Sequence, residues 1–266
     1  MNAPPPKVRL VCLDIDGTLT DGILGPPIPG TAAAVRRIRG RLRLPVRFVT
    51  NTTSVPHRVL AEMLSRQGFL EQTSELVTPV TVARRVLPDR GHARGILHAE
   101  PAAREDFAWF QDDPAGPSVL LATEAHDLRI ADLQPAFRRL LEGAAFYTLQ
   151  RNRYYKKGDA LVTDLGPVAA FLSYASGREA ETLGKPSAPL FDSVVKEARV
   201  SRAEIAMVGD DAEFDVSASV ALGMRGILVR TGKFRPEDAA RFTPRPTAVL
   251  DSVADLPAWL EGTNVS

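Results

Sequence analysis

Residues 8–18 of the chain read VRLVCLDIDGT, and this stretch decides the fold class. Its first six positions are mostly apolar β-formers, a pattern that predicts a buried strand of a parallel sheet. Asp14 and Asp16 follow directly, where the predicted strand ends. In open α/β sheets, ligands bind just past the carboxyl ends of the strands. Both carboxylates therefore stand where a functional site is expected.

The pair Asp14 and Asp16 can be interpreted in more than one way. Strand alternation puts both side chains on the same side, and Gly17 lets the chain turn without filling that space. Two close carboxylates repel each other, which raises one pKa and suits acid–base chemistry unless a cation compensates. The plain alternative is a solvated turn, because Asp-Gly is also a common hairpin signal. A calcium loop is set aside, because its twelfth position would be Gly25 and a strand precedes it.

The rest of the chain alternates between strand and helix patterns. Apolar runs predict further strands at 46–49, 76–77, 95–97, 118–122, 145–149, 205–208 and 226–229. Helical spacing of apolar residues predicts helices over 31–42, 54–67, 80–87, 132–142, 166–174, 187–198, 213–222 and 253–261. This order is typical of an α/β fold with helices packed on a parallel sheet. We predict one α/β core built from both ends of the chain and interrupted by a smaller inserted domain.

Composition excludes several classes of protein. With 266 residues, 44% of them hydrophobic and 24% charged, the chain has an average globular composition and enough length for one large domain or two modest ones. A single cysteine, Cys12, permits no intramolecular disulfide, and the first residues lack the layout of a secretion signal, so we expect a cytoplasmic protein. No stretch approaches the ~20 apolar residues of a membrane span. The net charge of +1 argues against a general nucleic-acid or lipid binder.

Polar residues follow the second predicted strand in the same way. Thr50 and Asn51 lead from strand 46–49 towards a helix, where hydroxyl, amide and backbone donors form a natural anion site. An ordinary N-terminal helix cap is an equally good interpretation of these polar residues. Lys185 precedes Pro186, which restricts it to an extended conformation and would fix the direction of its ammonium group.

A third group of carboxylates follows strand 205–208. Asp210 and Asp211 come just after this strand, and Asp215 lies on the next helix. A cluster of Asp14, Asp16 and Asp210 on neighbouring strands would be unstable without a metal. Oxygen-only ligands with room for water indicate Mg²⁺, although Mn²⁺ accepts the same ligands.

Together these motifs resemble the haloacid dehalogenase superfamily of phosphohydrolases in order, spacing and strand context. The resemblance implies that Asp14 is a nucleophile that forms an aspartyl-phosphate, and that Asp16 is the general acid and base. It implies phosphate binding by Thr50, Asn51 and Lys185, and metal binding by Asp14, the backbone carbonyl of Asp16, and Asp210. Asp211 and Asp215 are implied as supporting residues behind these ligands. Asp, rather than another residue, two positions after Asp14 favours a phosphatase over a dehalogenase.

The inserted part resembles the C2 cap of the 4-nitrophenylphosphatase or NagD-like group, subfamily IIA. It also resembles the phospholysine phosphohistidine inorganic pyrophosphate phosphatase branch. Both resemblances rest on the stretches 140–144, 153–156, 164–167, 184–187, 223–225 and 229–236. They imply a Rossmann-like core with a parallel sheet over 1–92 and 180–266, and an inserted α/β cap over 93–179. The segment 91–117 departs from the pattern, with HAEP at 98–101.

The resemblance implies a Mg²⁺-dependent phosphatase acting on a small phosphomonoester, phosphoamide or pyrophosphate. Asn152, Arg153, Tyr154 and Tyr155 lie in a polar, aromatic passage over 150–159 that either reads the substrate or simply coats the cap. Similar proteins form dimers through the cap, so a homodimer is a candidate assembly. Two alternatives stay open: a phosphotransferase or mutase with the same intermediate, and a catalytically idle protein that binds partners through the cap.

Overall fold

The computed structural model describes residues 6–122, 128–157 and 160–265, and these form two compact units. The first unit comprises Met1–Thr50, Arg58–Val77 and Phe191–Ser266, and the second comprises Asn51–His57 and Thr78–Leu190. Both ends of the chain thus belong to one unit. The boundaries of a cap over 93–179 stay a prediction, and each unit is described by itself.

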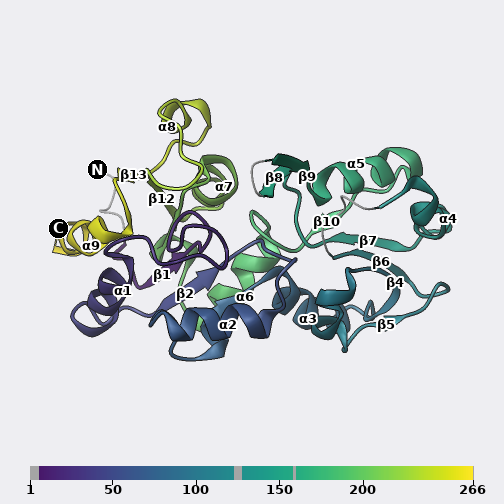
Figure 1. Cartoon of the computed structure of the whole chain (residues 1–266), viewed down its shortest axis with the longest axis horizontal. Coiled ribbons are helices and arrows are strands. Elements are labelled where there is room, and N and C mark those ends of the chain that lie inside the picture. Colours follow the sequence, from purple (N-terminus) through teal and green to yellow (C-terminus); the bar gives the residue numbers. More distant parts are fainter. Residues whose placement is uncertain (1–5, 123–127, 158–159, 266) are drawn as a thin grey trace. The chain divides into compact units, whose positions relative to one another are not determined.

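A six-stranded parallel sheet forms the centre of the first unit, in the order β13-β12-β11-β1-β2-β3. Its strands are β1 (Leu10–Leu13), β2 (Val46–Val49), β3 (Leu76–Val77), β11 (Ile205–Gly209), β12 (Arg225–Val229) and β13 (Ala248–Leu250). Figure 1 shows β1, near the N-terminus, beside strands from the C-terminal third of the chain. All four side chains of β1 are fully buried, as the apolar run predicted. The α/β fold class with a parallel sheet built from distant parts of the chain is confirmed.

Register in this sheet decides where the polar residues come together. Leu13 is paired with Val208 on one side and with Phe48 on the other. The strands β1, β11 and β2 therefore end at one edge of the sheet. The residues that follow them, Asp14, Asp210 and Thr50, begin at that edge.

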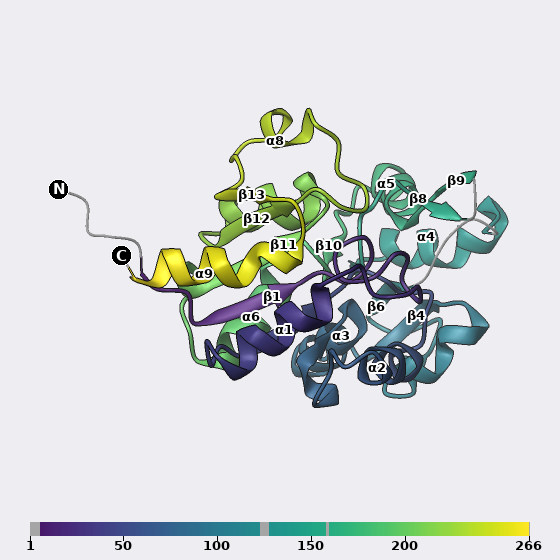
Figure 2. The ribbon, with the colours of Figure 1, turned by 60° about the vertical axis from the view of Figure 1, so that its left-hand side comes forward.

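Helices pack along this sheet and close the core of the first unit. They are α1 (Thr31–Gly40), α2 (His57–Arg66), α6 (Ala188–Ala198), α7 (Ala218–Ala221), α8 (Asp238–Arg241) and α9 (Leu256–Val265). Figure 2 shows α1 and α9 side by side, and an ion pair of 2.8 Å between Arg37 and Glu261 joins them. In the described part of the chain, no helix combines the length and apolar character needed to cross a membrane.

The helix predicted over 213–222 is present, but it is not α-helical throughout. The segment Ala212–Ser217 is a π-helix, and α7 follows it for one short turn. Asp211 explains the start of the element, because its side chain accepts hydrogen bonds from the N–H groups of Glu213 and Phe214, both at 3.0 Å. The wider π turn is of a kind found at functional sites. Here it carries the buried Asp215.

The second unit has its own parallel sheet, in the order β10-β7-β6-β4-β5. Its strands are β4 (Arg94–His98), β5 (Gln111–Asp112), β6 (Ser118–Leu121), β7 (Ala145–Thr148) and β10 (Glu181–Thr182), and its helices are α3 (Pro79–Asp89), α4 (Gln134–Leu141) and α5 (Leu165–Ser176). Val119, Leu121 and Phe146 pack in one apolar cluster with Leu140 of α4 and Leu172 of α5. The segment 91–117 forms β4, β5 and a 3₁₀ helix at Pro101–Phe107.

An antiparallel hairpin begins within the polar, aromatic passage over 150–159. Its strands β8 (Tyr154–Lys157) and β9 (Ala160–Thr163) pair antiparallel, with Tyr154 opposite Thr163 and Tyr155 opposite Val162. Cross-strand pairs of aromatic and β-branched residues stabilise such ribbons. Residues 158–159 of this passage lie outside the described residues.

The central strand gives a direct test of the sheet. Replacing the fully buried Leu10 by Ala leaves a cavity in the core, so we expect the free energy of unfolding to fall by about 2–5 kcal/mol. Leu24→Ala is the matched control, since that side chain is 49% exposed and its loss should cost about 0.5 kcal/mol or less. Urea denaturation followed by circular dichroism measures both. Equal losses for the two variants would contradict the burial of β1.

Candidate active site

Three buried carboxylates form the centre of the candidate site. Asp14 follows β1, Asp210 follows β11, and Asp215 lies on the π-helix; their side chains are 6%, 1% and 3% exposed. Each offers one oxygen, and these three oxygens lie within 4.8 Å of one another. The sequence prediction gave Asp215 only a supporting position, but the structure groups it with the other two.

Thr18 connects two of these carboxylates. Its hydroxyl lies 3.2 Å from Oδ1 of Asp210 and 3.4 Å from Oδ2 of Asp14, and it accepts a hydrogen bond from the backbone N–H of Asp210 at 3.1 Å. Thr18 is fully buried. It therefore fixes the spacing between Asp14 and Asp210, a role that the sequence analysis did not assign.

The loop after β12 holds the other oxygen of Asp210. The backbone N–H of Lys233 donates to Oδ2 of Asp210 at 2.6 Å, and the hydroxyl of Thr231 donates to the carbonyl of Gly17 at 2.6 Å. This loop was quoted in the sequence analysis without a role. The rule that found Asp14 and Asp210, polar residues directly after a buried strand, could also have found it.

Two glycines make this close approach possible. A Cβ atom on Gly17 would lie 2.3 Å from Oδ2 of Asp210, and one on Gly232 would lie 2.1 Å from the same atom. Both residues also have positive φ angles, +78° and +57°, which side chains disfavour. Oδ2 of Asp210 therefore lies between the backbones of Gly17 and Gly232.

Electrostatics in the cluster are unfavourable for a full set of charges. Burial, and then the neighbouring Asp14, raise the pKa of Asp210 to about 7, although Lys233 acts in the opposite direction. For Lys233, partial desolvation lowers the pKa, but the carboxylates of Asp211, Asp210, Asp14 and Asp215 outweigh this and the net pKa is raised. The cluster therefore favours nearby positive charge.

Asp16 and Asp211 lie beside this cluster. Asp16 is half-buried in the turn after β1, where its backbone forms a bridge with Thr20. Asp211 is half-buried, caps the π-helix with its side chain and donates its N–H to Asp215 at 3.4 Å. Thr50 is buried at the end of β2, with its N–H bonded to the carbonyl of Val77.

Asn51 and Lys185 lie together in the second unit. The side-chain amide of Asn51 donates to the carbonyl of Lys185 at 2.8 Å and accepts from its N–H at 2.7 Å. Gly184 makes room for this pair, because a Cβ atom there would lie 2.6 Å from the oxygen of Asn51. Two predicted phosphate-binding residues, 134 positions apart, are thus joined by a double hydrogen bond.

The predicted cap residues lie at the start of the β8–β9 hairpin. Tyr154 is 55% exposed, Arg153 is exposed, and Asn152 and Tyr155 are half-buried. A buried pair that the sequence analysis missed fixes this segment: Gln150 donates to Asp164 and accepts from the N–H of Asn152 at 2.6 Å. The N–H of Leu165 also donates to Asp164 at 2.7 Å.

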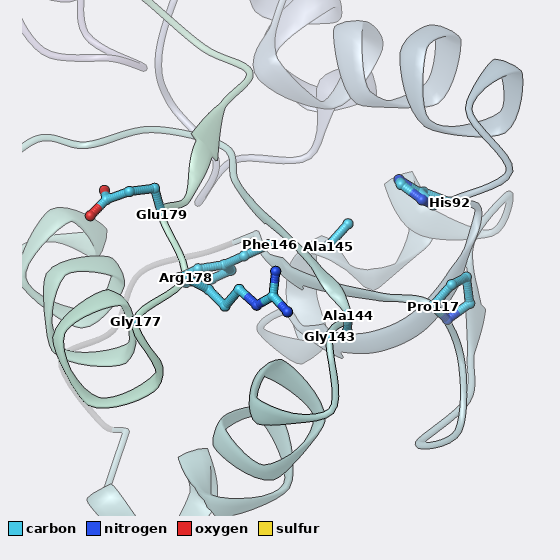
Figure 3. Close-up of a pocket in the computed structure, with 9 residues that line it drawn as sticks. All are labelled: His92, Pro117, Gly143, Ala144, Ala145, Phe146, Gly177, Arg178 and Glu179. Carbon is cyan, nitrogen blue, oxygen red and sulfur yellow. The ribbon is translucent and has the colours of Figure 1, made fainter.

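A cavity of about 620 Å³ lies in the second unit (Figure 3). Figure 3 shows Arg178 reaching towards Gly143, while the carboxylate of Glu179 points the other way. His92 and Phe146 also line this cavity. Its lining includes no residue of the predicted site.

Comparisons with known proteins place the chain in a family. Models of haloacid dehalogenase-like hydrolases match residues 11–108 and 182–256. The chain is 37% identical to the phospholysine phosphohistidine inorganic pyrophosphate phosphatase of Bos taurus, over 93% of this chain and 92% of that protein. It is 35% identical to the haloacid dehalogenase-like hydrolase domain-containing protein 2 of Homo sapiens, over 92% and 93%. The chain belongs to the haloacid dehalogenase-like hydrolases.

A solved structure agrees with this assignment at the level of the fold. NagD from E. coli K-12 superposes with a TM-score of 0.81 at 23% identity, covering 94% of this chain and 98% of that one. Both parallel sheets of the present chain thus fit the NagD-like fold, subfamily IIA, and the chain is a phosphatase of this family.

The acidic cluster of this hydrolase fits a divalent metal ion. Asp14, Asp210 and Asp215 supply only oxygen atoms, which hard cations such as Mg²⁺ prefer. A raised pKa at Asp210 is the cost of leaving such a group of carboxylates without a cation. The donor set, the burial and the charge of these three residues therefore all fit a metal site.

The close approach of Gly232 to Asp210 can be tested against a matched glycine. Gly223 also has a positive φ, +87°, but no atom lies within 4 Å of the place where its Cβ would stand. Gly223→Ala should therefore cost only the backbone strain, about 1–2 kcal/mol. Gly232→Ala adds the collision with Asp210 and should lower the free energy of unfolding by ~1–3 kcal/mol more. Denaturant titration of both variants measures the difference, and equal costs would contradict the described packing.

Proposed function

We propose that the chain is a Mg²⁺-dependent phosphatase that works through an aspartyl-phosphate on Asp14. The observation that carries this proposal is the buried group of Asp14, Asp210 and Asp215 at the edge of a parallel sheet, in a chain of this family. Asp14 and Asp210 are the proposed metal-binding side chains, with Asp215 as a further candidate. The backbone carbonyl of Asp16 completes the proposed protein ligands.

The proposed chemistry has two steps. In the first, a carboxylate oxygen of Asp14 forms a bond to phosphorus, the bond from phosphorus to the leaving oxygen breaks, and Asp16 gives that oxygen a proton. In the second, Asp16 takes a proton from water, the water oxygen bonds to phosphorus, and Asp14 is released with inorganic phosphate. One group acts as acid and then as base, so protons balance over the cycle.

Charge neutralisation is the main demand on the site. A phosphate dianion and the carboxylate of Asp14 repel each other, and Mg²⁺, when bound, supplies positive charge to both. Thr50, Asn51 and Lys185 are the proposed phosphate-binding residues. The double hydrogen bond between Asn51 and Lys185 supports a shared role, because it fixes the backbone on which the ammonium group is carried.

A small phosphorylated molecule is the proposed substrate. The relative from Bos taurus is named for phospholysine, phosphohistidine and inorganic pyrophosphate, which supports a phosphomonoester, phosphoamide or pyrophosphate here. We propose 93–179 as the cap, and Asn152, Arg153, Tyr154 and Tyr155 as its substrate-reading residues. The buried pair Gln150 and Asp164 supports this, because it orders the start of that segment.

We also propose a cytoplasmic homodimer. Cys12, buried in β1, is the one cysteine of the sequence, so no intramolecular disulfide can form, which suits a reducing compartment. Leu141, Phe171 and Tyr174 are exposed on α4 and α5 of the second unit, the last of them by 94%, and apolar side chains of this kind favour association.

The role of Asp14 as nucleophile can be tested by replacing one of its carboxylate oxygens with an amide nitrogen. Asp14→Asn keeps the shape of the side chain but removes the attacking carboxylate, so turnover of a chromogenic phosphate ester should fall by a factor on the order of 10⁴ or more. Asp21→Asn, at an exposed position in the same segment, is the control and should keep full activity. Circular dichroism checks that both variants fold. Undiminished turnover by the Asp14 variant would overturn the assigned nucleophile.

Metal removal tests the cofactor separately. Dialysis against EDTA should abolish turnover, and added Mg²⁺ should restore it because the acidic cluster again has a compensating charge. Mn²⁺ should restore part or all of it. EDTA saturated with Mg²⁺ beforehand is the control and should have no effect. Full turnover by the metal-free protein would rule out the proposed cofactor.

A further inference from the structure

Lys233 brings a permanent positive charge to the edge of the acidic cluster. Its ammonium nitrogen lies 3.7 Å from Oδ2 of Asp211, and it interacts electrostatically with Asp210, Asp14 and Asp215 as well. The three carboxylates of the proposed metal site and the neighbouring Asp211 therefore all act on this one side chain.

The backbone holds Lys233 in this place. Its N–H donates to Oδ2 of Asp210 at 2.6 Å, and two residues earlier Thr231 bonds to the carbonyl of Gly17 at 2.6 Å. The base of the side chain is thus fixed against the cluster. The Lys233 side chain as a whole is 59% exposed, so water reaches it beside the carboxylates.

A divalent cation among the same carboxylates would change this balance. Attraction to the acidic groups favours both the ammonium group and the metal ion, but the two cations repel each other. Each therefore lowers the occupancy of the other near the cluster. The protein without metal gains a compensating charge from Lys233, and the protein with metal does not need it.

We propose that Lys233 is a built-in counter-ion of the acidic cluster, which stabilises the metal-free protein and competes with the divalent cation. This inference rests on the proposed metal site. It implies that metal binding is weaker, and exchange of the ion faster, than the carboxylates alone would give.

The test is calorimetric titration of metal-stripped, full-length protein with Mg²⁺ alone. Lys233→Met removes the competing charge and should bind Mg²⁺ about tenfold more tightly, the effect of one unit charge several ångströms from a divalent ion in a water-accessible site. Lys233→Arg keeps the charge and should bind like the unmodified protein. Lys196→Met removes a charge from an exposed position on α6 and serves as the control for net charge.

Thermal melting supplies a second, independent measure on the same variants. In EDTA, Lys233→Met should melt below the unmodified protein and below Lys233→Arg, and saturating Mg²⁺ should narrow that gap. Equal or weaker Mg²⁺ affinity in Lys233→Met would overturn the inference, as would weaker binding of inorganic phosphate with unchanged Mg²⁺ affinity, since Lys233 would then be an anion contact. If the unmodified protein binds no Mg²⁺, the proposed metal site itself fails.

Discussion

The constraint on which the first unit depends is the enforced closeness of two buried carboxylates. Asp14 and Asp210 follow neighbouring strands whose register ends at one sheet edge, and the hydroxyl of Thr18 lies within hydrogen-bonding reach of both. Gly17 and Gly232 carry no side chains, which lets their backbones lie against Oδ2 of Asp210. The packing of the sheet and its loops therefore holds Asp14 and Asp210 close together in spite of the repulsion between their carboxylates.

The repulsion between these clustered carboxylates gives the site its affinity for positive charge. The cluster of buried carboxylates, in which the pKa of Asp210 is raised to about 7, becomes more stable when a proton binds or when an ammonium group or a metal ion lies beside it. In the proposed reaction a bound metal ion would also attract the phosphate of the substrate and offset the repulsion between that phosphate and Asp14. Stability of the metal-free chain and readiness for catalysis are thus opposing demands on the same few residues.

Local pattern was enough to predict most of the fold and much of the candidate site. The apolar run before Asp14 predicted β1, and the same rule placed Asp210 beside it, because strand periodicity and burial are local properties of the sequence. A helix after Asp211 was predicted but its π type was not, because the wider turn shows only in backbone hydrogen bonds such as the one from the N–H of Val216 to the carbonyl of Asp211. The hairpin at Tyr154–Thr163 was not predicted, because the Tyr-Tyr-Lys-Lys run at 154–157 does not alternate between apolar and polar residues. The loop with Lys233 follows the buried strand β12 and could have been singled out by the same rule, but the contact of Lys233 with Asp210, 23 positions away, is visible only in the tertiary structure.

Rapid acid quenching during turnover tests whether Asp14 carries the phosphoryl group. Enzyme mixed with a phosphate ester and Mg²⁺, quenched in acid and digested, should yield a phosphorylated peptide whose fragmentation places the phosphoryl group on Asp14. The same mixture without Mg²⁺ should yield the unmodified peptide. A peptide that stays unmodified throughout steady turnover, also when Asp16→Asn slows the second step, would contradict the account.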